Sequence, residues 1–160
     1  MLRDPDPADW PMHRRNFYGH SYSPLDEINT ENVKSLSLEW VWNMHEGDSE
    51  PAPLVYNGIV YLINPGNVLQ ALDGKTGELI WEHWTGPANR QDMRNIAMYD
   101  DKIIQSTTDA RIVALDARTG NQIWETQIAD NRQGFSNSSG PIVADGLVIS
   151  GLTGCTRDTP

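Results

Sequence analysis

Residues 71–81 read ALDGKTGELIW, and residues 114–124 repeat that phrase as ALDARTGNQIW, 43 positions later. Seven residue types recur in register: Ala71, Leu72, Asp73, Thr76, Gly77, Ile80 and Trp81 reappear as Ala114, Leu115, Asp116, Thr119, Gly120, Ile123 and Trp124. A repeat of about this length is typical of stacked supersecondary units, none of which can bury its apolar face alone. The phrase therefore predicts similar units packed side by side.

Each unit is predicted to consist of strands, because short apolar runs and period-two alternation surround the phrase. The predicted strands are 53–56, 59–63, 68–73 and 79–84 in the first unit, 95–99, 102–106, 111–116 and 122–127 in the second, and 141–144 and 147–151 in a third. Asn57-Gly58 separates the first two runs, and both residues tolerate the positive φ of a tight hairpin. Four short antiparallel strands per repeat predict an all-β fold of β-propeller blades. The chain then holds about 2.5 blades, at about 51–84, 94–128 and 138–160.

The repeated residues have mechanical roles in such a blade. Each aspartate is expected to bond its own backbone and start the turn, and each glycine to supply a left-handed conformation. The small alanines suit strands that crowd where blades meet. Trp81 and Trp124 are expected at the end of the outer strand, where each ring docks against the next blade.

Residues 1–37 are predicted to form an extended N-terminal segment with one short helical turn, N-capped by Thr30 and ending near Ser35. Residues 38–160 form the partial propeller. Leu38–Met44 is predicted as a lone strand with Trp40 and Trp42 on one face. In a propeller, such an early strand completes the last blade.

Composition excludes several classes of protein. Twenty-two acidic and twelve basic residues give a net charge of −10, which argues against a nucleic-acid partner. No apolar run is long enough to span a membrane, and the N-terminus lacks the features of a signal peptide. About 2.5 blades cannot close a ring, so the sequence is expected to be a fragment whose open strand edges favour aggregation.

The opening DWPMHRRNFYGHSYSPLDEINTENVKSLSLEW, together with both repeats, resembles the quinoprotein alcohol dehydrogenases. These are eight-bladed propellers that bind pyrroloquinoline quinone (PQQ), and their blades carry the motif A-x-D-x-x-T-G-x-x-x-W. The resemblance extends from Asp9 to Cys155. It implies that this chain is the N-terminal part of an eight-bladed propeller.

The resemblance also implies a set of quinone-binding residues. Glu50, in Glu50-Pro51-Ala52-Pro53-Leu54-Val55, matches a family glutamate that bonds the quinone, and Glu46 is a rival outside that frame. Arg94 falls where the family has an arginine that reaches the quinone's carboxylates and ortho-quinone edge. A guanidinium suits this task because it is permanently charged and meets planar oxygens two at a time. Without the family frame, both residues would be interpreted as surface charges.

Four further contacts fall in the third blade. Ser138, Thr153, Gly154 and Cys155 match a family hydroxyl residue and the Ser/Thr-Gly-Ala step that follows it. Their hydroxyls and backbone amides would meet carboxylates, and glycine would allow close approach. Asn137-Ser138-Ser139 also matches a glycosylation sequon, which we interpret as a coincidence because a glycan would block the pocket.

Three departures from the family pattern stand out. Ala88 and Asn89 replace two adjacent cysteines that form a disulfide in many members. Thr156 replaces a metal-binding glutamate, and the nearby Asp158 is not assigned as a ligand. Cys155 stands where most relatives have alanine, and is expected either to pair with a later cysteine or to be a small buried thiol.

The family resemblance implies oxidation of an alcohol, with electrons stored on PQQ and passed to a cytochrome c. It further implies a Ca²⁺ or lanthanide ion and a catalytic aspartate, with that aspartate and most metal ligands beyond Pro160, and a periplasmic location. Two alternatives stay open: a non-enzymatic PQQ-like propeller acting as an assembly scaffold, or one acting as a sensor domain. Both explain the tryptophans but not the joint appearance of Glu50, Arg94 and Thr153-Gly154.

Overall fold

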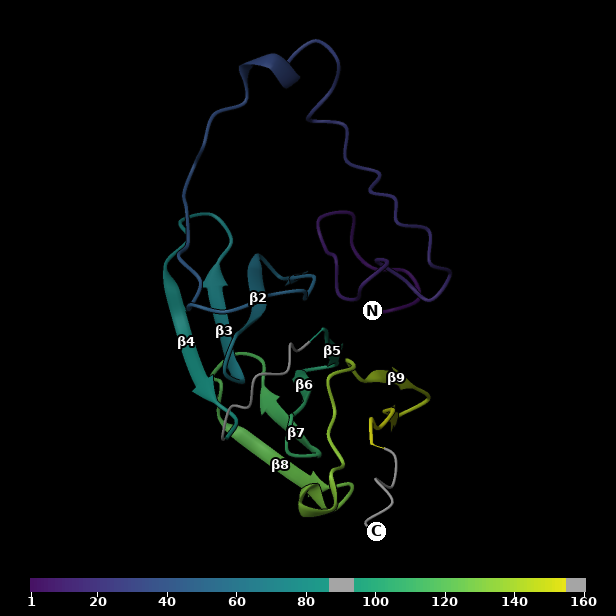
Figure 1. Ribbon diagram of the computed structural model, residues 1–160. Coiled ribbons are helices and arrows are strands. Elements are labelled where there is room, and N and C mark those ends of the chain that lie inside the picture. Colours follow the sequence, from purple (N-terminus) through teal and green to yellow (C-terminus); the bar gives the residue numbers. More distant parts are fainter. Residues whose placement is uncertain (87–93, 155–160) are drawn as a thin grey trace.

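The structure, a computed structural model, describes residues 1–86 and 94–154 and is built from antiparallel strands (Figure 1). Two four-stranded sheets and one two-stranded sheet follow one another along the described chain. The first sheet contains β1 (Leu54–Tyr56), β2 (Ile59–Asn64), β3 (Val68–Asp73) and β4 (Leu79–Trp84). The second contains β5 (Ile96–Tyr99), β6 (Lys102–Ser106), β7 (Arg111–Asp116) and β8 (Gln122–Gln127). The third pairs β9 (Ile142–Ala144) with β10 (Leu147–Ile149).

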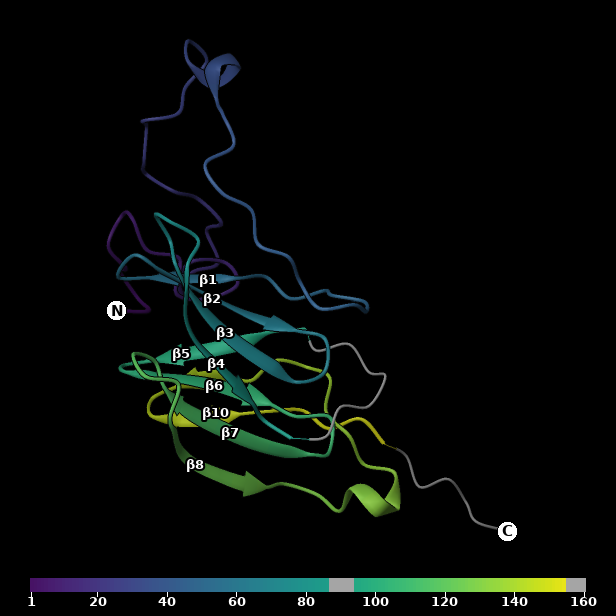
Figure 2. The ribbon, with the colours of Figure 1, turned by 90° about the vertical axis from the view of Figure 1, so that its left-hand side faces the viewer.

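The sheets are stacked face to face, as Figure 2 shows for the first two. Each four-stranded sheet runs in sequence order from its first to its last strand, which is the connectivity of a propeller blade. The all-β propeller prediction is thus confirmed. One apolar core fills the space between the first and second sheets, and a smaller one fills the space between the second and third. Leu69 and Val113 are fully buried in the first of these cores.

The repeated phrase gives the same local structure twice. Asp73 Oδ1 accepts the backbone N–H groups of Lys75 and Thr76, and Asp116 Oδ1 accepts those of Arg118 and Thr119. Gly77 and Gly120 have φ values of +73° and +70°. Register shifts in the β3–β4 and β7–β8 pairings also coincide with the repeated Ala-Leu step. The predicted roles of these aspartates and glycines are therefore confirmed.

Trp81 docks onto the second sheet. Its indole Nε1 donates to the Ala117 carbonyl at 3.0 Å, and a Cβ placed on Gly120 would lie 2.6 Å from the Trp81 ring. The ring is third in β4, so its predicted place at the end of the outer strand is wrong by about half a strand. Trp124 occupies the same position in β8 and is only half-buried.

Trp40 makes the same contact with the first sheet, although no repeat phrase surrounds it. Its Nε1 donates to the Gly74 carbonyl at 3.1 Å, and a Cβ on Gly77 would lie 2.6 Å from its ring. Leu38–Met44 joins no ladder among the described residues, and the last blade that it was predicted to complete is not among them, so its pairing stays a prediction. The stretch is held by side chains instead: Trp42 Nε1 donates to Gln70 Oε1 at 3.0 Å.

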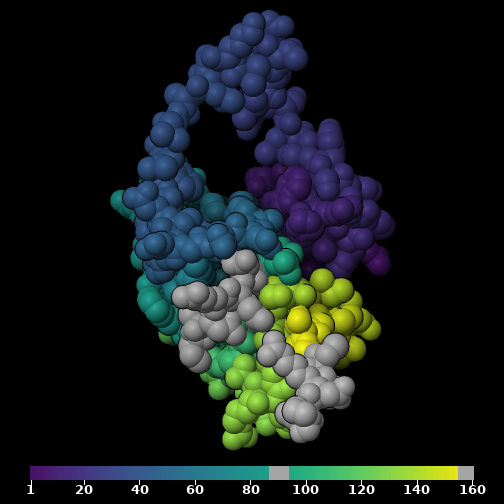
Figure 3. Space-filling model, viewed as in Figure 1, coloured from purple at the N-terminus to yellow at the C-terminus, as the bar shows by residue number. Residues whose placement is uncertain are grey.

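The N-terminal segment has two parts. Trp10 exchanges two backbone hydrogen bonds with Val55, so the first residues lie beside β1. The part of the chain around the 3₁₀ turn η1 (Val33–Ser35) projects from the body of the molecule, and Figure 3 shows this projection in dark blue. Asn32, not Thr30, is the N-cap residue of η1, and its side chain bonds the backbone of Asn29. A second 3₁₀ turn, η2, spans Asn131–Gln133. No helix in residues 1–86 and 94–154 is long and apolar enough to cross a membrane.

Candidate functional site

Three of the predicted site residues lie just before the first strands of the three sheets. Glu50 precedes β1, Arg94 precedes β5 and Ser138 precedes β9. Arg94 Nε donates to Glu50 Oε2 at 2.7 Å, and the Arg94 backbone N–H donates to the Ser138 carbonyl at 3.0 Å. Arg94 therefore joins residues that are separated by 44 positions on each side of it in the sequence.

Thr153 and Gly154 follow β10 and lie against residues 134–136, which precede Ser138 in the chain. Thr153 and Ser136 exchange two backbone hydrogen bonds of 2.8 Å each. Gly154 has a φ of +143°, and a Cβ there would lie 2.9 Å from the Gly134 carbonyl oxygen. Position 154 therefore requires glycine because its backbone lies close to another part of the same chain.

A second glycine brings the leading ends of the second and third sheets together. A Cβ on Gly140 would lie 2.1 Å from Asn95 Cβ and 2.8 Å from the Asn95 backbone. No other residue fits there unless the backbone moves. This contact allows the hydrogen bond between the neighbouring Arg94 and Ser138.

The Arg94–Glu50 pair is accessible to a ligand. The two side chains are 55% and 48% exposed. An ion pair this exposed contributes only about 0–1 kcal/mol to stability, so it is not needed to hold the fold together. In the described part of the chain, the Arg94 side chain donates only through Nε, which leaves its two terminal nitrogens to meet an anionic group.

Several predicted positions fall outside the described residues: Cys155, Ala88, Asn89, Thr156 and Asp158. Glu46, the alternative to Glu50 as the quinone-binding glutamate, lies on an exposed stretch before Glu50, and it forms no ion pair among the described residues. Within residues 1–86 and 94–154, no group of three or more His, Cys, Asp or Glu side chains is arranged to hold a metal ion.

Asn137 is a site residue that the sequence pattern missed. It lies fully buried between Ser136 and Ser138, and its amide nitrogen donates to Ser150 Oγ at 2.7 Å. The nitrogen that glycosylation would modify is therefore already engaged inside the protein, which agrees with the interpretation of the sequon as a coincidence. A buried amide carries no signal in the sequence beyond its polar type.

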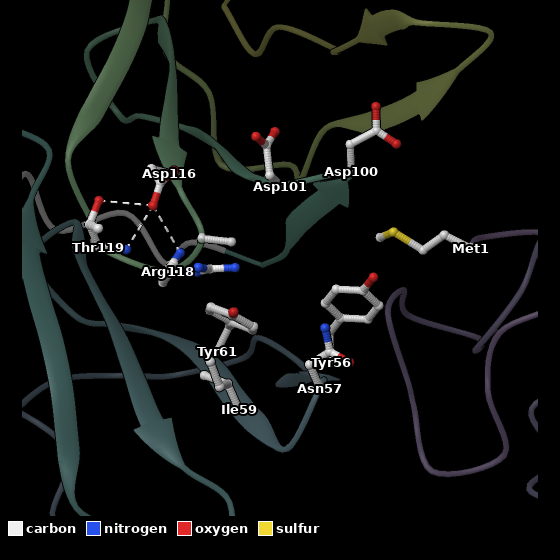
Figure 4. Close-up of a pocket in the computed structure, with 11 residues that line it drawn as sticks. Met1, Tyr56, Asn57, Ile59, Tyr61, Asp100, Asp101, Asp116, Arg118 and Thr119 are labelled. Carbon is white, nitrogen blue, oxygen red and sulfur yellow. Dashed lines mark hydrogen bonds between the residues drawn. The ribbon is translucent and has the colours of Figure 1, made fainter.

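A separate cleft of about 610 Å³ lies at the opposite ends of the strands, between the hairpin turns of the first two sheets (Figure 4). Tyr56 and Tyr61 face Asp100 and Asp101 across it. Burial, together with the Asp116 carboxylate, raises the pKa of the Tyr61 phenol to about 12. None of the predicted site residues lines this cleft.

Comparison with known proteins decides the family. The β-propeller domain family described as "PQQ: glucose/ethanol/alcohol dehydrogenase" matches residues 10–153. The chain belongs to this PQQ-dependent alcohol dehydrogenase family. The match includes Glu50, Arg94 and Ser138, and it ends at Thr153.

Individual members of the PQQ-dependent family resemble the chain along nearly all its length. The alcohol dehydrogenase (quinone), dehydrogenase subunit, of Gluconobacter oxydans (strain 621H) is 34% identical over 92% of this chain and 22% of that protein. The 1-butanol dehydrogenase (cytochrome c) of Thauera butanivorans is 30% identical over 92% of this chain and 23% of that protein. A solved europium-containing methanol dehydrogenase matches with a TM-score of 0.84 and 30% identity, over 93% of this chain and 28% of its own. The chain thus spans about a quarter of the length of the relatives it matches.

Proposed function

We propose that this chain forms part of the PQQ pocket of an alcohol dehydrogenase that oxidises an alcohol to an aldehyde or ketone. The observation that carries the proposal is the junction at Arg94, which bonds Glu50 through its side chain and Ser138 through its backbone. The cofactor-binding residues proposed are Glu50, Arg94, Ser138, Thr153, Gly154 and Cys155, the last of which lies outside the described residues.

The donor set fits a planar, multiply anionic quinone. The terminal nitrogens of Arg94 supply paired N–H donors for carboxylate or quinone oxygens, and Glu50 fixes the plane of the guanidinium through Nε. Thr153 is exposed and Ser138 is half-buried, and we assign their hydroxyl groups as further donors to the quinone. When bound, PQQ supplies the acceptor for two electrons, and these residues bind and orient it.

Other parts of the reaction are assigned to the rest of the protein. A Ca²⁺ or lanthanide ion is proposed to act beside the quinone, a catalytic aspartate to accept the alcohol proton, and a cytochrome c to accept the electrons. The name of the Thauera relative supports the cytochrome c, and the similarity to a europium-containing methanol dehydrogenase supports the metal ion. A periplasmic location is proposed from the family alone.

The test uses the full-length protein, freed of cofactor and titrated with PQQ in the presence of Ca²⁺ or a lanthanide. We expect a quinone absorption band and dye-linked oxidation of a primary alcohol. Cytochrome c added in place of the dye should become reduced. If neither the band nor alcohol oxidation appears with either ion, the enzyme proposal fails, and a non-enzymatic scaffold or sensor propeller becomes the better description.

A matched pair of arginine variants links this activity to the site. Arg94→Lys removes the fork of donors, which is worth about 1.5–3 kcal/mol for charged hydrogen bonds, so PQQ should bind about 10- to 100-fold more weakly. Arg132→Lys is the control, since Arg132 also pairs through Nε with a carboxylate, that of Asp130, but on the exposed turn η2. Equal PQQ affinity in the two variants would show that Arg94 does not bind the cofactor.

A further inference from the structure

The segment 136–139 holds two of the proposed quinone contacts in place, yet it belongs to no regular strand. Its backbone faces two partners: Ser136 pairs with Thr153, and Ser138 accepts the backbone N–H of Arg94. A segment without a ladder on either side needs another restraint to keep one conformation. Without one, Thr153 and Ser138 could move relative to Arg94.

Asn137 supplies that restraint from inside the protein. Its side chain is fully buried, and both ends of its amide are used. The amide oxygen accepts the backbone N–H of Ser139 at 3.0 Å, which closes a local turn around Ser138. The amide nitrogen donates to Ser150 Oγ at 2.7 Å, which ties the segment to the end of β10.

The same hydroxyl continues the connection into the second sheet. Ser150 Oγ lies 3.1 Å from Ser106 Oγ, and Ser106 is fully buried at the end of β6. The Asn137 amide therefore links the segment 136–139 to the end of β10 directly and, through the Ser150 hydroxyl, to the second sheet. Only a short amide does this, because a carboxylate lacks the N–H and a hydroxyl is too short to reach both partners.

We infer that Asn137 is a positioning residue for the quinone: it fixes Ser138 and, through Ser136, Thr153 at the distance from Arg94 that the cofactor requires. This inference rests on the proposed function. Asn137 touches no substrate and acts through its neighbours, with Ser150 as its partner. Such a role predicts a loss of cofactor affinity that is separate from the loss of fold stability.

The experiment measures the dissociation constant for PQQ in the full-length protein at fixed Ca²⁺ for Asn137→Ala, Ser150→Ala and the double variant. One lost hydrogen bond corresponds to roughly a threefold to tenfold change. We expect about tenfold weaker binding for Asn137→Ala and about threefold for Ser150→Ala. The double variant should resemble Asn137→Ala, because residues of one network are not additive. At saturating PQQ, the KM for the alcohol should stay at the wild-type value.

Val113→Ala is the matched control, because it opens a cavity in the core between the first two sheets without touching the segment 136–139. It should lower the melting temperature and leave the PQQ dissociation constant unchanged. If Asn137→Ala does not fold, Ser150→Ala still decides the matter, since Ser150 is only partly buried. Wild-type PQQ affinity in the folded variants would overturn the inference alone, whereas wild-type protein that binds no PQQ would overturn the proposed function.

Discussion

The close contact between Trp81 and Gly120 means that adding one methyl group at position 120 tests how much this docking contact contributes to the stability of the protein. Gly120 has a φ of +70°, and a Cβ added there would lie 2.6 Å from two ring atoms of Trp81. Gly120→Ala therefore carries two costs. The left-handed backbone costs roughly 1–2 kcal/mol for an L-residue, and overpacking a filled site costs about 1–3 kcal/mol. The total is about 2–5 kcal/mol.

Gly58→Ala separates the two costs. Gly58 has a φ of +73°, so its backbone strain equals that of Gly120, but a Cβ added there meets nothing within 4 Å. It should cost only the roughly 1–2 kcal/mol of backbone strain. The difference between the variants, about 1–3 kcal/mol, is then the cost of pushing Trp81 out of its place.

The assay is equilibrium unfolding in urea, followed by circular dichroism, with the same form of the protein carrying each variant. The midpoint should fall further for Gly120→Ala than for Gly58→Ala, while the slope with urea stays constant. Equal losses in the two variants would show that the tryptophan yields without cost. In that case the contact between Trp81 and Gly120 contributes nothing measurable to the free energy of unfolding.

Three further outcomes are expected. Trp81→Phe should cost about 1–3 kcal/mol of unfolding free energy, because the Ala117 carbonyl loses its indole donor; a change below 0.5 kcal/mol, on the order of an ordinary surface substitution, would contradict this. Gly140→Ala should cost about 1–3 kcal/mol and weaken PQQ binding, because its methyl group would overlap Asn95; unchanged urea unfolding would show that the backbone can shift freely. Because the pKa of Tyr61 is raised in the folded protein, its contribution to stability is complete below pH 10 and is lost as the pH rises through about 12. Tyr61→Phe should abolish this loss of stability and also the phenolate absorbance change near pH 12. If either the loss or the absorbance change persists in the variant, it belongs to another group.

Most of the strand positions could be predicted because the controlling interactions are local. In the three sheets, five predicted strands have the observed bounds and five differ by one or two residues, since hairpin turns such as Asn57-Gly58 leave little freedom in where a strand stops. The strand predicted at Leu38–Met44 has no such hairpin and joins no ladder among the described residues. The helical turn was misplaced because Asn29 and Asn32 bond each other's backbone and compete with Thr30 for the N-cap.

The candidate site was predictable only where a family frame existed. Glu50 and Arg94 are 44 residues apart and look like ordinary surface charges, so their 2.7 Å contact follows from blade stacking and not from any local pattern. Asn137 was missed because its importance comes from burial and from partners at 139 and 150. The sequence places Trp40 on one face of a predicted strand, but its docking role could not be predicted because the rest of the repeat phrase is absent around it.

The docking of Trp40 and Trp81 gives the stack of sheets a polarity. Each indole enters the turn of the sheet that follows it in the chain: Trp40 meets Gly77, and Trp81 meets Gly120. The first sheet therefore receives a ring from the preceding segment and sends its own ring into the second sheet, so its two faces are not interchangeable. A sheet inserted upside down would bring two rings together on one side and two receptors on the other. This asymmetry selects one direction of assembly and disfavours inverted pairing between neighbouring blades or between separate chains.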